Sequence, residues 1–249
     1  MTPAHTILLL AAGAAAGIVG SAGGTASLVS YPALLAVGLS PLTANVTNAV
    51  AFVAAWPGSA IGSRTELRGQ GPWLRRQAPL VVAGSAAGAA VLLLTPAPAF
   101  AKVVPYLLAL AALALLLQPR ATKWLASRPE GRHRLLLPVG LIAVCAYDGY
   151  WGAGAGIMTL TVLMIATAQQ LVAANAVKNM VLGIADVTCC AVFVLCFPMD
   201  WPAVIPMAVG CLIGGAIGPS VTRRVPPDAL RILAALAGLA LAVRLWTAS

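Results

Sequence analysis

Two glycine-rich stretches decide the fold of this chain: GIVGSAGG at residues 17–24 and GYWGAGAG at residues 149–156. Each interrupts apolar sequence near the start of one half of the chain. Their glycines match at a constant offset, so that Gly17, Gly20 and Gly24 pair with Gly149, Gly152 and Gly156. Such interruptions at matching places in two apolar halves indicate broken helices around a binding site near the membrane midplane. The pattern predicts a small transporter.

Composition places the chain in a membrane. Of its 249 residues, 61% are apolar and only 8% are charged, and the mean hydropathy is +0.95. Soluble domains carry about 25% charged residues, so much of this surface must face lipid. Because spans of about 20 residues fill the chain, we expect one all-α integral membrane domain.

The net charge of +9 is concentrated between the apolar segments. Basic residues gather in the stretches 63–76, 119–134 and 220–228. The positive-inside rule predicts that all three are cytoplasmic loops. No basic face with interleaved aromatic residues, as in a nucleic-acid binder, accompanies them. The expected partners are therefore the lipid bilayer and a small substrate, with no nucleic acid.

Motifs for metal binding or catalysis are missing from the sequence. The five cysteines lie in apolar surroundings without zinc-ligand spacing. No HExxH, GxSxG or paired-histidine arrangement occurs, and an enzyme needs converging acid, base or nucleophilic groups. We expect no metal, no cofactor and no enzymatic activity.

The apolar segments repeat. They lie near 6–20, 25–39, 43–62, 78–95 and 101–118, and then near 135–150, 156–168, 171–197, 201–219 and 229–246. Five segments, a basic stretch and five more indicate an internal repeat. We expect a first transmembrane repeat at 1–118, a basic cytoplasmic linker at 119–134 and a second repeat at 135–249.

The basic loops also predict how the halves are inserted. Loop 63–76 is basic, whereas the corresponding connection of the second half, 197–200, has no Lys or Arg. Corresponding loops then lie on opposite sides, which makes the halves inverted repeats. Both termini are expected outside a plasma membrane of the bacterial inner-membrane type.

The segments that open each half are short. Residues 6–20 and 25–39 each make about 15 residues of helix, or roughly 22 Å, against a hydrocarbon core of about 30 Å. Two readings remain open, because these segments are either thin tilted spans or re-entrant hairpins that meet at the glycines.

Helix breaks at membrane depth must line protein or a wet cavity. Helices that begin near Thr25 and Ile157 would aim free N–H groups at that cavity, and two such N-termini form an anion site. The alternative is that the glycines only let helices pack closely.

Polar side chains gather in the third and eighth segments. Asn45 and Asn48 lie in the third, and the eighth carries a stripe on one helical face: Asn175, Lys178, Asn179 and Asp186. A lysine within a span is a functional hypothesis. Lys178 is expected to bind an anion while Asn48 and Asn179 donate hydrogen bonds. Alternatively, Lys178 pairs with Asp186 or Asp148, or extends to the interface.

Two acids fall within the predicted spans, Asp148 and Asp186. Either is a candidate for proton exchange during transport. Pairing of a buried carboxylate with a helix end or with Lys178 is an equally good reading.

The order of these features resembles the TauE/SafE (TSUP) family of membrane permeases. The resemblance runs over roughly residues 7–246: a glycine-rich break, a Pro-containing second segment, an Ala-Asn-x-x-Asn region, and a second glycine-rich break after a basic loop. It implies that the family's glycine-rich positions are Gly20, Gly23, Gly24, Gly152, Gly154 and Gly156. Ser21 and Ala22 make the first run less glycine-dense than is usual there, and no proline matching Pro32 follows the second run.

The resemblance also implies a substrate class, sulfur oxyanions and organosulfonates. We therefore expect a secondary transporter, first of all an exporter, of a small anion such as sulfite, thiosulfate or a sulfonate. Its inverted halves would alternate access to a site between them. The alternative is a non-transporting membrane subunit that packs against partner proteins.

Overall fold

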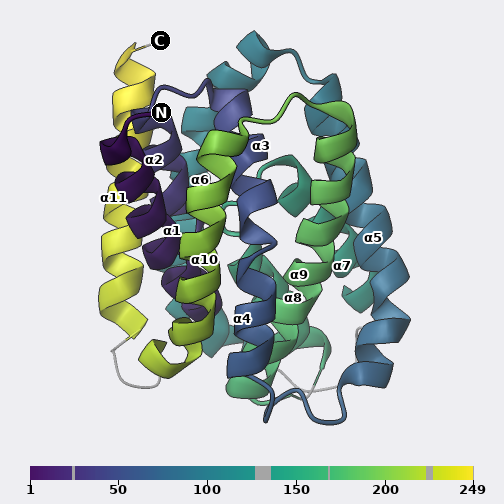
Figure 1. Ribbon diagram of the computed structural model, residues 1–249. Helices are drawn as coiled ribbons and strands as arrows, with labels where there is room; N and C mark the ends of the chain where they lie inside the picture. The colour runs from purple at the N-terminus through teal and green to yellow at the C-terminus, as the bar shows by residue number, and fades with distance from the viewer. Residues whose placement is uncertain (24–25, 127–135, 168, 223–226, 249) are drawn as a thin grey trace.

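The computed structural model describes residues 1–23, 26–126, 136–167, 169–222 and 227–248 (Figure 1). Every regular element in these ranges is a helix. In chain order they are α1 (Pro3–Gly23), α2 (Ser27–Ala36), α3 (Pro41–Phe52), α4 (Ala55–Gly62), α5 (Gly71–Leu94), α6 (Ala97–Ala126), α7 (Leu136–Tyr150), α8 (Ala155–Ala166), α9 (Leu171–Cys196), α10 (Trp201–Thr222) and α11 (Pro227–Ala248).

Four of these helices are long and apolar enough to cross a membrane. They are α1 over Pro3–Ser21, α5, α9, and α10 over Trp201–Gly218. The prediction of an all-α polytopic membrane protein is therefore confirmed.

Three boundaries differ from the sequence-based expectation. Helix α1 runs through the first glycine-rich stretch and has 21 residues, so it is not the short segment predicted at 6–20. The expected third segment is two helices, because Pro57 in the first turn of α4 has no N–H to donate to the carbonyl of Val53. Helix α6 continues to Ala126, so the expected linker begins as helix, and its remainder lies outside the described residues.

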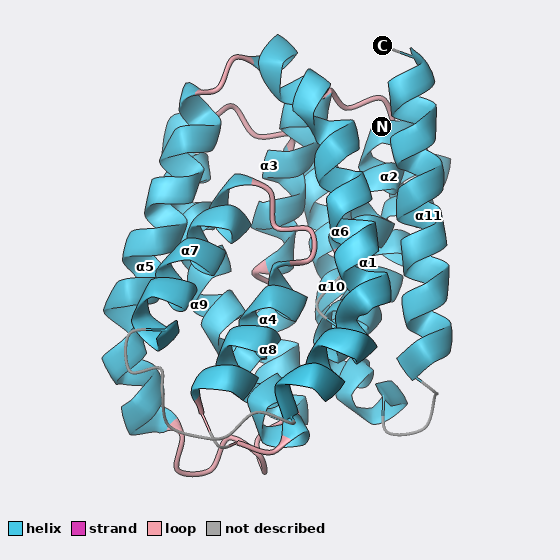
Figure 2. Cartoon of the chain, turned by 180° about the vertical axis from the view of Figure 1, so that it is seen from behind, coloured by secondary structure: helices cyan, strands magenta, loops and turns pink. Residues whose placement is uncertain are grey.

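Both termini lie at one end of the bundle, and the basic connection 63–70 lies at the other (Figure 1). From the terminal end α1 descends and α2 returns to that end. Helix α7 rises from the opposite end, and α8 returns there. Figure 2 shows their connection in the middle of the bundle. With 10 and 12 residues, α2 and α8 make about 15 and 18 Å of helix, too little for a span. These lengths favour the re-entrant reading for α2 and α8.

Glycines bring two helix pairs into backbone contact. Helix α1 packs along α10, and α5 packs along α7. A Cβ on Gly17 would lie 2.6 Å from the carbonyl oxygen of Cys211, and one on Gly88 would overlap the carbonyl oxygen of Ala146. The glycines of α1 continue the helix because they serve this contact. Close packing was the alternative reading of the glycine runs, and it holds for Gly17.

Replacing Gly88 by alanine should separate α5 from α7, because the new methyl meets a backbone atom that cannot move alone. We expect the substitution to lower the stability of the purified protein by about 1–3 kcal/mol, which is typical of overpacking. A thermal unfolding curve in detergent measures the change. Gly71→Ala is the matched control, since nothing lies within 4 Å of a methyl at that end of the same helix. Equal curves for the two variants would contradict the close contact.

The predicted orientation can be tested with a native cysteine. Cys196 is exposed and ends α9, at the terminal end of the bundle (Figure 1). Because the basic loops are predicted to be cytoplasmic, a membrane-impermeant maleimide should label Cys196 from outside intact cells. Thr65→Cys in a Cys196→Ser background, in the basic connection 63–70, should be labelled only after lysis. The reverse pattern would invert the topology.

Candidate functional site

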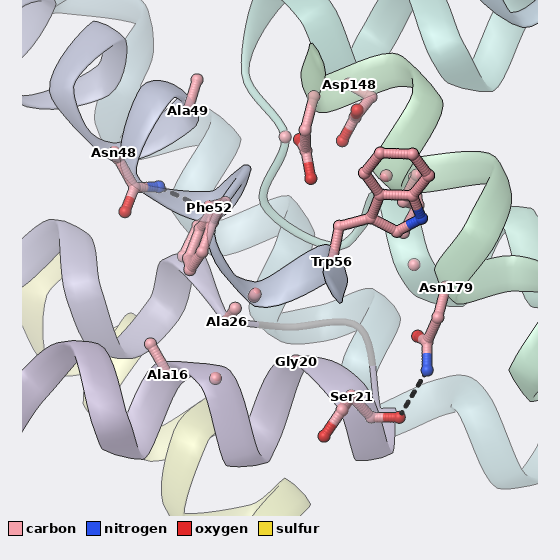
Figure 3. A pocket seen from close by; sticks show the side chains of 18 of the residues that line it. Ala16, Gly20, Ser21, Ala26, Asn48, Ala49, Phe52, Trp56, Asp148 and Asn179 are labelled. Carbon is pink, nitrogen blue, oxygen red and sulfur yellow. Dashed lines mark hydrogen bonds between the residues drawn. The ribbon is translucent and has the colours of Figure 1, made fainter. Parts of the chain in front are cut away.

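A cavity of about 100 Å³ lies where two re-entrant hairpins, α1–α2 and α7–α8, meet α3, α4 and α9 (Figure 3). Residues of α1 to α4 line one side, and residues of α7 to α9 line the other. Both halves of the chain therefore build one cavity. The other helices, α5, α6, α10 and α11, contribute no residue to the described lining.

Eight of the residues predicted to bind substrate or protons meet in this lining. They are Gly20, Asn45, Asn48, Asp148, Gly152, Gly156, Asn179 and Asp186. In Figure 3 the Asp148 carboxyl, the Asn48 amide and the Asn179 amide surround the same space, with Gly20 and Ser21 of α1 beside it.

The remaining candidates lie elsewhere. Gly154 packs near Ala111 of α6, and Gly23 is the last residue of α1. Asn175 and Lys178 are not among the described residues of the cavity lining. Gly24 and Thr25 lie outside the described residues.

Lys178 binds the end of α1. Its side chain is fully buried, and its Nζ donates to the carbonyl oxygen of Gly20 at 3.4 Å. Asn175 and Asn179 donate through Nδ2 to the carbonyl oxygen of Ser21, at 3.0 and 3.4 Å. The last four carbonyls of a helix have no partner within it, and a cation at this end also offsets its partial negative charge. Asn175, Lys178 and Asn179 of α9 thus cap the C-terminal end of α1.

Asparagines of α3 hold the other helix ends. Asn45 donates through Nδ2 to the carbonyl oxygen of Tyr150, the last residue of α7, at 3.0 Å. Asn48 donates to Ser27 Oγ at 3.1 Å and accepts from Ser30 Oγ at 2.5 Å. Asn48 therefore fixes the first turn of α2 beside the cavity, where the sequence predicted a helix N-terminus.

The second predicted N-terminus also reaches the cavity. Helix α8 begins after Gly154, whose φ of +85° is left-handed, and Gly152 before it has φ +79°. Such conformations favour glycine. Gly156, in the first turn of α8, lines the cavity. Each helix starts two residues from its predicted position, at Ser27 rather than Thr25 and at Ala155 rather than Ile157.

Two carboxyl groups face one small space. Asp148 on α7 and Asp186 on α9 both line the cavity, and they are near enough for their charges to interact. Oδ2 of Asp148 is enclosed and has no hydrogen-bond partner. The described lining holds no Lys, Arg or His, so the site offers hydroxyls, amides and helix N-termini as neutral donors.

Sequence reasoning missed several lining residues: Ser21, Ser27, Phe52, Trp56, Ser59 and Trp151. A signal existed for Phe52, which is seven residues after Asn45 and so shares its helical face. Trp56 follows the break between α3 and α4. Its Nε1 donates to Met180 Sδ at 3.3 Å, and its ring fills the place where Gly183 has no side chain.

Comparison with known proteins agrees with this architecture. The profile described as "Sulfite exporter TauE/SafE" matches residues 9–245. The chain is similar to the probable membrane transporter protein YfcA of Escherichia coli strain K12, with 27% identity over 209 residues that cover 82% of this chain and 75% of YfcA. YfcA proteins of the O6:H1 strain CFT073 and of O157:H7 match equally. No solved structure matches. Because the profile covers nearly the whole sequence, the chain belongs to the sulfite exporter TauE/SafE family and is a membrane transporter.

Proposed function

We propose that the protein is a secondary transporter of a small sulfur-containing anion, such as sulfite, thiosulfate or a sulfonate, in a membrane of the bacterial inner-membrane type. The observation that carries the proposal is the cavity between two hairpins that enter from opposite ends of the bundle. The name of the family supports the substrate class.

The helix packing supports two inverted repeats, residues 1–118 and 135–249. Helix α1 packs on α10 as α7 packs on α5, and α2 packs on α11 as α8 packs on α6. Each of these contacts therefore has a counterpart in which the two halves have exchanged roles. In this correspondence α3 and α4 together match α9, and all of them supply side chains to the cavity.

The proposed binding groups are the neutral donors of the lining. Ser27 and Gly156 mark the helix N-termini, and the amides of Asn48 and Asn179 lie between them. N-termini of helices attract anions through their free N–H groups and positive dipole ends. Lys178 and Asn175 are proposed to act indirectly, because they hold the end of α1 in place.

In the proposed alternating access, two rigid bodies move, and each contains helices from both halves of the chain. The backbone contacts join α1 to α10 and α5 to α7, and α4 also packs on α10 while α9 packs on α5. Interiors packed this closely shift as units. We therefore assign one body to α1, α4 and α10 and the other to α5, α7 and α9, with the cavity between them.

Export is the proposed direction. A negative-inside potential favours outward movement of an anion by about 2.3 kcal/mol per charge per 100 mV. Asp148 and Asp186 are the proposed proton-coupling groups, because ionised carboxyls would repel an anion in this small space. A proton that travels with a divalent anion removes that repulsion and cancels only part of the charge moved, so the potential still favours export.

Proteoliposomes loaded with sulfite, thiosulfate or a small sulfonate should release at least one of these anions faster than empty liposomes. Chloride and acetate at equal concentration are the controls for selectivity, and an ion-selective or colorimetric assay outside the vesicles measures release. Equal release from both kinds of liposome for every sulfur anion would refute the proposed substrate class.

Asp186→Asn should uncouple anion transport from proton transport. In the wild type, anion release should carry protons, reported by a pH-sensitive dye inside the vesicles. Release should then respond less steeply to a potential set with potassium and valinomycin than release by the variant. In the variant, the proton signal should fall while anion release persists and becomes more voltage-dependent. Asp200→Asn, at the start of α10 and outside the cavity, is the control. Wild-type release without proton movement would remove the coupling.

A further inference from the structure

We propose that the indole N–H of Trp151 is a hydrogen-bond donor to the transported oxyanion. This inference rests on the proposed function and adds a specificity-determining residue to its site. Trp151 lines the cavity and lies in the connection between α7 and α8. Its position within the second glycine-rich run did not by itself indicate a role.

The ring of Trp151 is held firmly. Its exposed fraction is 3%. The ring meets Tyr31 edge to face, with centroids 5.0 Å apart, and lies 5.7 Å from Phe100. The backbone N–H of Trp151 donates to the carbonyl oxygen of Tyr147 at 2.8 Å. A donor fixed in this way needs little reorganisation to bind a ligand.

The indole Nε1 of Trp151 is enclosed and has no acceptor. The polar atoms of neighbouring aromatic residues do have partners: Trp56 Nε1 donates to Met180 Sδ, Tyr31 Oη to the carbonyl of Pro41, and Tyr147 Oη to the carbonyl of Ala153. A buried indole N–H usually finds a partner. An acceptor that arrives with the substrate supplies one here.

The chemistry of the missing partner follows from the donor. An indole N–H only donates, so its ligand must present an acceptor. Among the described residues of the cavity lining, the other enclosed side-chain atom without a partner is Oδ2 of Asp148, three residues earlier. A protonated Asp148 donates as well, and an oxyanion with several oxygens can accept from both groups. Because Nε1 is enclosed, the side chains over it shift when the cavity is occupied.

Replacement of Trp151 by benzothienylalanine tests the donor alone. This residue keeps the fused ring and carries sulfur in place of N–H, so the contacts with Tyr31 and Phe100 remain. We expect the affinity for sulfite, measured by calorimetry or by ligand-induced thermal shift, to fall about 10- to 100-fold, as for loss of a hydrogen bond to a charged group. The unfolding temperature without ligand should stay unchanged or rise. The same replacement at Trp201, which is 48% exposed, is the matched control.

A spectroscopic signal identifies the contact directly. In protein with ¹⁵N-labelled tryptophan, the indole resonance that Trp151→Phe removes should move on addition of sulfite, and the Trp201 resonance should not. Unchanged sulfite affinity in the benzothienylalanine variant would overturn this inference and leave the proposed function intact. Failure of the wild type to bind any sulfur oxyanion would instead overturn the proposed function.

Discussion

A helix that ends inside a membrane protein leaves backbone carbonyls that lipid cannot satisfy, and the ends of α1 and α7 pose this problem here. Side chains on neighbouring helices solve it. Lys178 and Asn179 of α9 bond the end of α1, while Asn45 of α3 bonds the end of α7. Each capping helix belongs to the other half of the chain. The broken ends can therefore exist only when both halves are assembled, and the cavity forms at the same contacts.

Glycine makes the second contribution to this arrangement. Backbone contact between α1 and α10, and between α5 and α7, sets the position of each re-entrant hairpin relative to a helix of the opposite half. Without a hydrophobic driving force between helices in lipid, such close packing supplies much of their attraction. The hairpin ends are thus fixed twice, by glycine contacts along the helix and by amide caps at its end.

Sequence reasoning predicted the residues of this site better than their roles. Helical spacing correctly placed Asn179 and Asp186 on one face, and fixed offsets paired the glycine runs. The bond of Lys178 to Gly20 could not be predicted, because the two residues are far apart in sequence and spacing says nothing about which helix faces α9. The length of α1 was underestimated for a related reason. A glycine run breaks a helix or packs against another, and only the presence of α10 decides between them.

The position of Lys178 behind α1 fits the needs of a transporter. A bare ammonium in the cavity would hold an anion strongly, whereas a carrier must also release it. Bonded to Gly20, Lys178 instead offsets the partial negative charge at the end of α1, which would otherwise repel an anion beside Gly20 and Ser21. The binding groups that remain are neutral donors, and the charged groups of the lining are the two acids. In the proposed mechanism, the protonation of Asp148 and Asp186 sets the attraction for an anion, so that the groups proposed to admit the substrate would expel it when they lose their protons.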